Sequence, residues 1–283
     1  MIIALSGHRG FIGSNIKKTF SDHTFILVNR DELYGDYRSL AEKIAGADVV
    51  INSAGFSVSS RWTKKNKKHI YDSRIKVTNN LVKAINSLTK KPDLFINNSG
   101  IALYEYDKKH TESDYSCNDD FLAEVVKEWE KSANAVDKNV KLIIIRLGLV
   151  LGKDGGAMPR LLRLFRMGLG GVLASGKQVY SFIHIDDVTR ALEYLMIYNN
   201  KGVYNFTAPF PVTNREFTKA LGKILNRPSI FRVPRFVLKL IMGEGAVLVT
   251  KGQSVYPQNL LDAGFVFTFG TIDKAIENLV SKR

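Results

Sequence analysis

Short apolar runs divide the first half of the chain, and each has the length of a β-strand. A continuous apolar run of this size predicts a strand that is buried on both faces, the kind found in parallel sheets. The run Lys141-Leu142-Ile143-Ile144-Ile145 shows the pattern most clearly, because all of its residues after Lys141 are apolar. The predicted strands lie at residues 2–5, 25–28, 48–52, 93–97 and 141–145.

Hydrophobic and polar positions between these runs follow helical spacing instead. Between residues 63 and 88, for example, Ile70, Ile75 and Leu81 recur near the period of an α-helix. Strands that alternate with helices predict an α/β fold with a doubly wound parallel sheet of the Rossmann type. The predicted helices of this half span residues 11–20, 63–88 and 121–136.

After Gly152 the pattern changes to short pieces that glycine and proline interrupt. The predicted helices here lie at residues 187–195, 214–225 and 235–242. Asp186 is the predicted N-cap of the first of them. We therefore expect residues 1–152 to form the Rossmann core and residues 153–283 to form mainly a smaller lobe that caps the carboxyl edge of the sheet. Residues 180–206 are expected to return to the core.

Three glycines directly follow the first predicted strand and precede the first predicted helix. They have the spacing G-x-x-G-x-x-G. Glycine allows a tight turn and lets the backbone approach a pyrophosphate at the N-terminus of the helix. An ordinary turn is the alternative, but the strand–loop–helix context favours a dinucleotide site. The predicted cofactor contacts of this loop are Gly7, Arg9, Gly10, Phe11, Ile12 and Gly13.

The end of the second predicted strand indicates which nicotinamide cofactor the site prefers. Sites that prefer NAD carry an Asp or Glu about 20 residues after the loop, where it binds the ribose 2′-hydroxyl. Here that position is Asn29, and Arg30 follows it. A guanidinium suits a 2′-phosphate, which Arg9 could approach from the other side. Asp31 could serve a ribose if the strand ended later, but the sequence favours NADP over NAD.

The third predicted strand ends in small residues, Ser53-Ala54-Gly55. Their position at the carboxyl edge of the sheet predicts contacts with a ribose and the phosphates of the cofactor. A plain strand end is the alternative, since small residues alone do not define a site.

Composition places the chain among ordinary globular proteins. Apolar residues make up 45% and charged residues 24% of its 283 residues, which is typical of a globular domain. The single cysteine, Cys117, allows no internal disulfide and fits a reducing compartment. No apolar run is long enough to span a membrane and no signal peptide is visible, so we expect a cytoplasmic protein with no membrane partner.

A formal net charge of +14 is open to two interpretations. It could favour a polyanion such as nucleic acid, or it could be a solvated lysine-rich surface around a site for an anionic cofactor. The densest run, Lys64-Lys65-Asn66-Lys67-Lys68, lacks the glycines and aromatic residues of an RNA-binding segment. We therefore favour the solvated surface and expect no nucleic-acid partner.

Motifs along nearly the whole chain carry a resemblance to a known family. Besides the glycine loop, they include Asn52-Ser53-Ala54-Gly55, Arg61-Trp62, Trp129-Glu130, Ile183-His184-Ile185-Asp186-Asp187, Arg232-Val233-Pro234 and Met242-Gly243-Glu244. With them the chain resembles the extended short-chain dehydrogenase/reductase superfamily. Within it, the likeness is to the atypical, NAD(P)-dependent epimerase-like branch known as epimerase family proteins, which have a C-terminal domain of unknown function.

This resemblance implies a fold, a cofactor and a substrate cleft. It implies a Rossmann core with bound NADP(H) and a cleft between core and lobe for an unknown small-molecule substrate. Members of the superfamily often dimerise, so a homodimer is among the expected states. By the same likeness, the positions that meet NADP are Asn29, Arg30, Ser53, Arg74 and Val150.

One departure from the family pattern concerns the chemistry. Members with redox activity carry Tyr-x-x-x-Lys on the helix before the fifth strand, where the tyrosine exchanges a proton and the lysine lowers its pKa. At the matching positions this sequence has Phe121 and Val125, which can neither exchange a proton nor hold a charge. The usual acid/base pair is therefore absent.

Two other side chains are candidates for the chemistry. The superfamily places a serine that binds the substrate oxygen at the end of the fourth strand, where Ser99 lies in this sequence. Tyr104 and Tyr106 follow on the next loop, and Tyr104 is the predicted catalytic tyrosine. Packing of the loop is the alternative role for both tyrosines. No metal site is expected, because His184 beside Asp186 lacks the spacing of a ligand set.

These features predict an NADP(H)-dependent oxidoreductase or epimerase-like enzyme that acts on a small hydroxyl or carbonyl substrate. The missing tyrosine and lysine leave a second hypothesis open, in which the chain binds NADP(H) without catalysis and acts through a partner.

Overall fold

A six-stranded sheet forms the centre of the computed structural model, which describes residues 1–198 and 200–281. The strands are β1 (Ile2–Ser6), β2 (Thr24–Val28), β3 (Val49–Asn52), β4 (Leu94–Gly100), β6 (Lys141–Leu147) and β12 (Gly202–Phe206). Their order is β12-β6-β4-β3-β1-β2, and every neighbouring pair is parallel. β1 lies between β2 and β3, so β2 is added on one side of β1 and the later strands are added on the other side. The predicted doubly wound α/β fold is confirmed.

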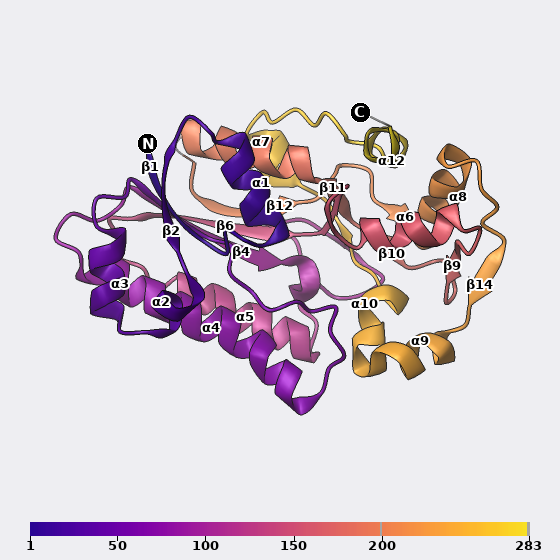
Figure 1. The fold of residues 1–283 in the computed structure, drawn as a ribbon, viewed down its shortest axis with the longest axis horizontal. Helices are drawn as coiled ribbons and strands as arrows, with labels where there is room; N and C mark the ends of the chain where they lie inside the picture. The colour runs from indigo at the N-terminus through magenta and orange to yellow at the C-terminus, as the bar shows by residue number, and fades with distance from the viewer. Residues whose placement is uncertain (199, 282–283) are drawn as a thin grey trace.

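Helices cover both faces of this sheet (Figure 1). One face carries α1 (Phe11–Thr19) and α7 (Ile185–Ile197), and the other carries α2 (Arg30–Tyr34), α3 (Tyr37–Ile44), α4 (Lys64–Ser87) and α5 (Phe121–Ala133). Successive residues of a strand point to opposite faces. Ile3 and Leu5 therefore join the buried cluster beneath α1 and α7, whereas Ala4 joins the cluster beneath α3 and α4.

The ends of two core helices follow from local hydrogen bonds. α4 lies within a residue of its predicted bounds at each end. Thr63 defines its start, because the Thr63 Oγ1 accepts a hydrogen bond from the Asn66 N–H at 3.2 Å and so caps the helix. α5 is shorter than predicted. It ends at Ala133, where Asn134 is the C-cap and its side chain donates to the Glu130 carbonyl oxygen at 2.7 Å.

α7 begins earlier than predicted, and its N-cap is His184 rather than Asp186, so that prediction is wrong. The His184 Nδ1 accepts a hydrogen bond from the Asp186 N–H at 3.1 Å. The His184 ring is buried against Phe269, and burial lowers its pKa, so the neutral ring can accept this bond. Asp186 and Asp187 lie in the first turn, where the positive end of the helix dipole attracts a carboxylate.

The second half of the chain builds a smaller lobe at the carboxyl edge of the sheet (Figure 1). Its strands are β7 (Leu149–Gly152), β8 (Gly155–Gly156), β9 (Gly171–Leu173), β10 (Val179–Tyr180), β11 (Phe182–His184), β13 (Val212–Thr213) and β14 (Phe231–Val233). Its helices are α6 (Met158–Arg166), α8 (Asn214–Ile224), α9 (Arg235–Met242), α10 (Val247–Thr250) and α12 (Ile272–Val280), with a 3-10 turn η2 (Gly243–Ala246). α11 (Gln258–Asp262) instead packs on β12 of the core, where Leu260 joins the cluster beneath α1 and α7. Leu162, Phe217 and Ile276 tie α6, α8 and α12 into one buried cluster.

The chain crosses between the core and this lobe more than once. β12 completes the central sheet after the lobe has begun. Later, β15 (Ser254–Val255) pairs with β5 (Lys109–His110), which follows β4 and the 3-10 turn η1 (Ile101–Leu103). The predicted boundary at residue 152 stays a prediction.

Candidate functional site

The glycine loop between β1 and α1 forms a cradle that only glycine fits. Gly7 has a φ of +71°, in the left-handed region, and a Cβ there would overlap the backbone of Ser53 at the end of β3. A Cβ at Gly13 would likewise overlap the Gly7 carbonyl. The loop therefore lies directly against the carboxyl ends of β1 and β3.

The N-terminus of α1 opens into this cradle. Gly10 is its N-cap and offers no side-chain cap, and within this described stretch no acidic residue lies in the first turn. The first N–H groups of a helix lack partners within the helix, and together with the positive end of the dipole they favour an anion. The side chain of Phe11 packs over Gly152, and that of Ile12 packs against the core. Their backbone N–H groups lie in the first turn of α1, where we expect them to meet a phosphate. The cradle fits a pyrophosphate.

Two guanidinium groups without acidic partners lie on the segments that follow β1 and β2. Arg9 is exposed in the glycine loop, and Arg30 is the exposed first residue of α2. Neither forms an ion pair with any residue the structure describes. Asn29 is the N-cap of α2, and its N–H donates to the Glu32 Oε2 at 2.6 Å. Arg30 therefore follows the strand end, and Asp31 lies within the helix.

Arg74 on α4 has the most unusual environment of the predicted cofactor residues. Its Nη1 donates to the carbonyl oxygens of Phe56 and Ile70, both at 3.1 Å, and its guanidinium lies 5.1 Å from the centre of the Trp129 ring. Burial lowers its pKa to about 10, and no carboxylate in the described chain pairs with it. A Cβ on Gly55 would lie 3.3 Å from its Nη2. Because a partly buried cation without a counter-charge is costly, this position fits a phosphate.

The remaining predicted cofactor residues border the same edge. The Ser53 Oγ accepts a hydrogen bond from the Asn98 side chain at 3.0 Å, and the Ala54 N–H donates to the Asn52 Oδ1 at 3.3 Å. Val150 lies on β7 and packs against the cluster beneath α1. The structure thus brings the end of β3 directly against the glycine loop, while contacts of these residues with a cofactor stay predictions.

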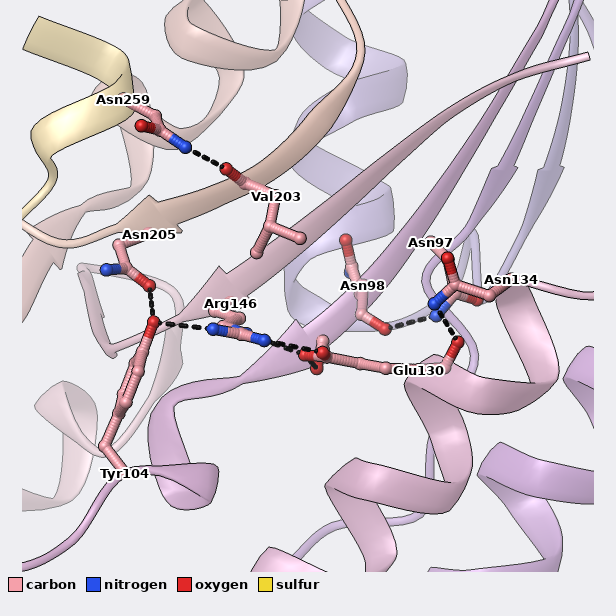
Figure 2. A network of polar contacts seen from close by, with 10 residues as sticks. Asn97, Asn98, Tyr104, Glu130, Asn134, Arg146, Val203, Asn205 and Asn259 are labelled. Carbon is pink, nitrogen blue, oxygen red and sulfur yellow. Dashed lines mark hydrogen bonds and ion pairs between the residues drawn. The ribbon is translucent and has the colours of Figure 1, made fainter. Parts of the chain in front are cut away.

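A buried polar network joins β4, α5, β6 and β12 (Figure 2). Arg146 donates through Nε and Nη2 to the two carboxylate oxygens of Glu130, at 2.8 Å each. Its Nη1 donates to the Tyr104 hydroxyl at 2.8 Å, and this hydroxyl donates to the Asn205 Oδ1 at 2.7 Å. The Ser99 hydroxyl donates to the Glu130 Oε1 at 2.7 Å. The two charges of this network, on Arg146 and Glu130, are therefore paired in fixed geometry.

This network holds both residues that the sequence nominates for catalysis. Tyr104 is fully buried, its ring stacks on His110, and burial raises its pKa to about 12. Ser99 is buried as well. Tyr106, the next tyrosine on this loop, donates to the carboxylate of Asp120. These contacts favour the packing role for Tyr104, and the catalytic roles of Ser99 and Tyr104 stay predictions.

Apolar contacts surround the positions of the missing Tyr and Lys. Phe121 begins α5, and the Trp62 ring meets it edge-on with 5.4 Å between centroids. The Lys67 Nζ lies 5.1 Å from the centre of the Phe121 ring and pairs with the carboxylate of Glu244 in η2. Val125 is buried. An ion pair between α4 and the capping lobe therefore lies over Phe121.

A cavity of about 810 Å³ lies between the loop after β4, the β9–β10 turn, the β14–α9 connection and α10. Its charged lining residues are Lys177, Arg232, Arg235, Lys251 and Asp107. Asp107 pairs with Lys251 at 3.6 Å, which leaves the lining with an excess of positive charge. Such a lining attracts an anion. The hydrophobic pattern of the sequence does not reveal this site, because its residues come from segments far apart along the chain.

None of the helices that the structure describes combines the length and apolarity needed to cross a membrane. The described part of the chain contains no group of three or more His, Cys, Asp or Glu residues that could hold a metal ion.

Comparisons with known proteins define the class of this fold and loop. Residues 3–206 match the NAD dependent epimerase/dehydratase family, and residues 233–279 match a domain of unknown function, DUF1731. The chain belongs to the NAD dependent epimerase/dehydratase family. The resemblance seen in the sequence is confirmed, including its C-terminal domain.

Individual relatives match along the whole chain. It is 35% identical to the chloroplastic epimerase family protein SDR39U1 homolog of Arabidopsis thaliana, over 99% of this chain and 87% of that protein. It is 34% identical to the epimerase family protein SDR39U1 of Mus musculus, over 99% of this chain and all of that protein. The crystal structure of human epimerase family protein SDR39U1 (isoform 2) with NADPH aligns with a TM-score of 0.92 at 29% identity, over 99% of each chain.

Proposed function

We propose that the chain is an epimerase-like enzyme of the extended short-chain dehydrogenase type that uses NADP(H) on a small hydroxyl or carbonyl substrate. The observation that carries this proposal is the glycine cradle at the start of α1, with the exposed Arg30 at the end of β2. The NADPH in the structure of the human relative supports the same cofactor. We also propose a cytoplasmic location, although one relative carries a chloroplastic name.

Each residue of the cofactor site has a distinct role in this proposal. The N–H groups at the start of α1 bind the pyrophosphate, and Arg74 neutralises a phosphate near the end of β3. Arg30 and Arg9 pair with the 2′-phosphate, which is the group that distinguishes NADP(H) from NAD(H). NADP(H), when bound, supplies or accepts a hydride.

The substrate in this proposal is a small anion. Its site is the cavity of about 810 Å³, a size within the range of small-molecule sites. Lys177, Arg232 and Arg235 favour a ligand with a phosphate or carboxylate group. The lysine of the Asp107–Lys251 pair contributes less, because its charge is already balanced.

Cofactor binding without catalysis is a second candidate function. Phe121 and Val125 favour it, because neither can take the place of the tyrosine and lysine that redox members use. The buried hydrogen bonds of Ser99 and Tyr104 also favour it. In this case NADP(H) would order the fold for a partner.

Two measurements on the purified full-length chain separate these functions. Calorimetric titration with NADPH tests the cofactor, and failure to bind NADPH would contradict both candidates. Oxidation of NADPH is then followed at its nicotinamide absorbance across a panel of phosphorylated and carboxylated carbonyl compounds. Turnover supports the enzyme, whereas tight binding with no oxidation of NADPH supports the second candidate.

A further inference from the structure

The solvent side of α9 exposes a row of large apolar side chains. Phe236, Leu240 and Ile241 are 71%, 74% and 66% exposed. Phe236 and Leu240 are four residues apart and so lie on one face of the helix, with Ile241 beside them. Single exposed apolar residues are common on soluble proteins, but a contiguous group marks a contact surface.

The strand that leads into α9 also exposes large apolar side chains. Ile230 and Phe231 are 82% and 51% exposed. β14 pairs in parallel with β9, with Phe231 opposite Gly171, so Leu169 lies at the same end of the pair as Ile230 and is itself 56% exposed. β14 and α9 follow the outer edge of the capping lobe (Figure 1). The α9 surface is defined as Phe236, Leu240 and Ile241.

Positive charge accompanies the α9 surface. Residues 226–242 contain Arg227, Arg232, Arg235 and Lys239 but no Asp or Glu. Arg235 and Lys239 are four residues apart and form a cationic row next to the row of Phe236 and Leu240. The next acidic residue along the chain, Glu244, already pairs with Lys67.

We propose that the α9 surface binds an anionic lipid bilayer. The apolar row enters the boundary between headgroups and acyl chains, while Lys239 of the same helix lies against a lipid phosphate. A helix that lies in the plane of the interface needs no long apolar run. The sequence-based expectation of no membrane partner rested on the lack of such a run and did not consider this mode of binding.

Two other occupants fit the α9 surface less well. A second copy of the chain would place the same arginines and lysine against each other, with no carboxylate of residues 226–242 to pair with them. Nucleic acid would pair with the cations and stack on Phe236, but it would leave Leu240 and Ile241 without an apolar partner.

Sedimentation of the full-length chain with vesicles tests the proposal. The chain is expected to sediment with vesicles of phosphatidylcholine and phosphatidylglycerol, to remain in solution with phosphatidylcholine alone, and to be released by salt. The variant F236S/L240S/I241S is expected to lose roughly tenfold or more in vesicle partition, since three apolar side chains no longer insert. Val266→Ser is the matched control, because Val266 is 74% exposed but lies outside the α9 surface. Wild-type binding by the triple variant, or equal binding to both kinds of vesicle, would overturn the proposal.

Fluorescence of Phe236→Trp gives a second measurement that keeps the apolar character of the surface. Both natural tryptophans, Trp62 and Trp129, are buried, so a change on adding vesicles reports on position 236. The emission is expected to shift to shorter wavelength with phosphatidylglycerol vesicles and to stay unchanged with phosphatidylcholine alone. A blue-shifted emission that depends on protein concentration without lipid would instead indicate a dimer through this surface. Binding of RNA with no binding of anionic vesicles would also contradict the proposal.

Discussion

Arg30 is exposed, follows the end of β2 and has no ion-pair partner among the described residues, so its guanidinium is available to a 2′-phosphate. Arg30→Ala is expected to weaken NADPH binding by about 1.5–3 kcal/mol, the range for a hydrogen bond to a charged group. NADH lacks the 2′-phosphate and should bind the variant as it binds the wild type. Calorimetry with both nucleotides measures the difference, and Arg38→Ala, another exposed arginine, is the control. Equal losses for the two nucleotides would contradict the NADP assignment.

The buried hydroxyl of Tyr104 has a hydrogen-bond partner on each side, Arg146 and Asn205. Tyr104→Phe keeps the ring on His110 but leaves the Arg146 Nη1 and the Asn205 Oδ1 without their buried partner. We expect a loss of about 1–3 kcal/mol in the free energy of unfolding, measured in urea. NADPH affinity should stay at the wild-type value. Tyr115→Phe, at a 41% exposed residue, is the control and should have no effect. Wild-type stability in Tyr104→Phe together with lost turnover would favour the catalytic role.

Glu112 makes the stability of the fold depend on pH. Its Oε1 accepts from the Asn205 N–H at 2.8 Å, but no described group meets its buried Oε2. Burial raises its pKa, so the folded state holds the proton more tightly than the unfolded state does. The contribution of Glu112 to stability is therefore fully present below the ordinary carboxyl pKa and is lost as the pH rises through the folded-state pKa.

Glu112→Gln removes this titration. The variant is expected to lose less stability than the wild type between acidic and neutral pH, as measured by urea unfolding across that range. Glu124→Gln, on the exposed side of α5, is the control and should keep the wild-type pH dependence. The same pH dependence in Glu112→Gln would show that another group causes it.

The loop between β1 and α1 is the element on which cofactor binding depends. In Gly7→Ala the new Cβ would overlap the Ser53 backbone at a positive φ, so the loop has to move away from β3. We expect NADPH binding to be lost and stability to fall by about 1–3 kcal/mol. Gly46→Ala is the matched control, because Gly46 also has a positive φ but open space around it. It should lose some stability and keep NADPH affinity, and loss of binding in both variants would argue against the cradle.

Local patterns predict the elements of the core better than their ends. The buried apolar runs and the helical spacing of α4 are properties of neighbouring residues, and the strands and helices appear where these patterns put them. The start of α7 could not be predicted, because His184 becomes a cap only once Phe269 from the far end of the chain buries its ring.

The candidate site divides in the same way. The glycine loop and Arg30 are short motifs and could be found in the sequence. The environment of Tyr104 depends on Arg146 and Asn205, which come from different strands of the sheet. Its hydrogen bonds, like the lining of the cavity, therefore need the three-dimensional fold.

At the scale of the whole molecule, packing rather than charge joins the core to the capping lobe. Trp62 is buried against Phe121, and a Cβ on Gly245 of η2 would lie 3.2 Å from its ring. Trp62→Ala is expected to cost about 3–5 kcal/mol of stability. Glu244→Gln breaks the ion pair with Lys67, but Glu244 is 66% exposed, so the cost should be about 0–1 kcal/mol. Urea unfolding compares the two variants, and a larger loss in Glu244→Gln would contradict this account.

Affinity of the wild-type chain for NADPH and for NADH tests the central claim most directly. The cradle at α1 is common to both nucleotides, whereas Arg30 and Arg9 have a phosphate to pair with only in NADPH. Calorimetric titration of the full-length chain with each nucleotide should give a Kd for NADPH that is about tenfold or more below that for NADH, a difference of about 1.4 kcal/mol or more. Equal affinity, tighter binding of NADH, or no binding of NADPH would contradict the account.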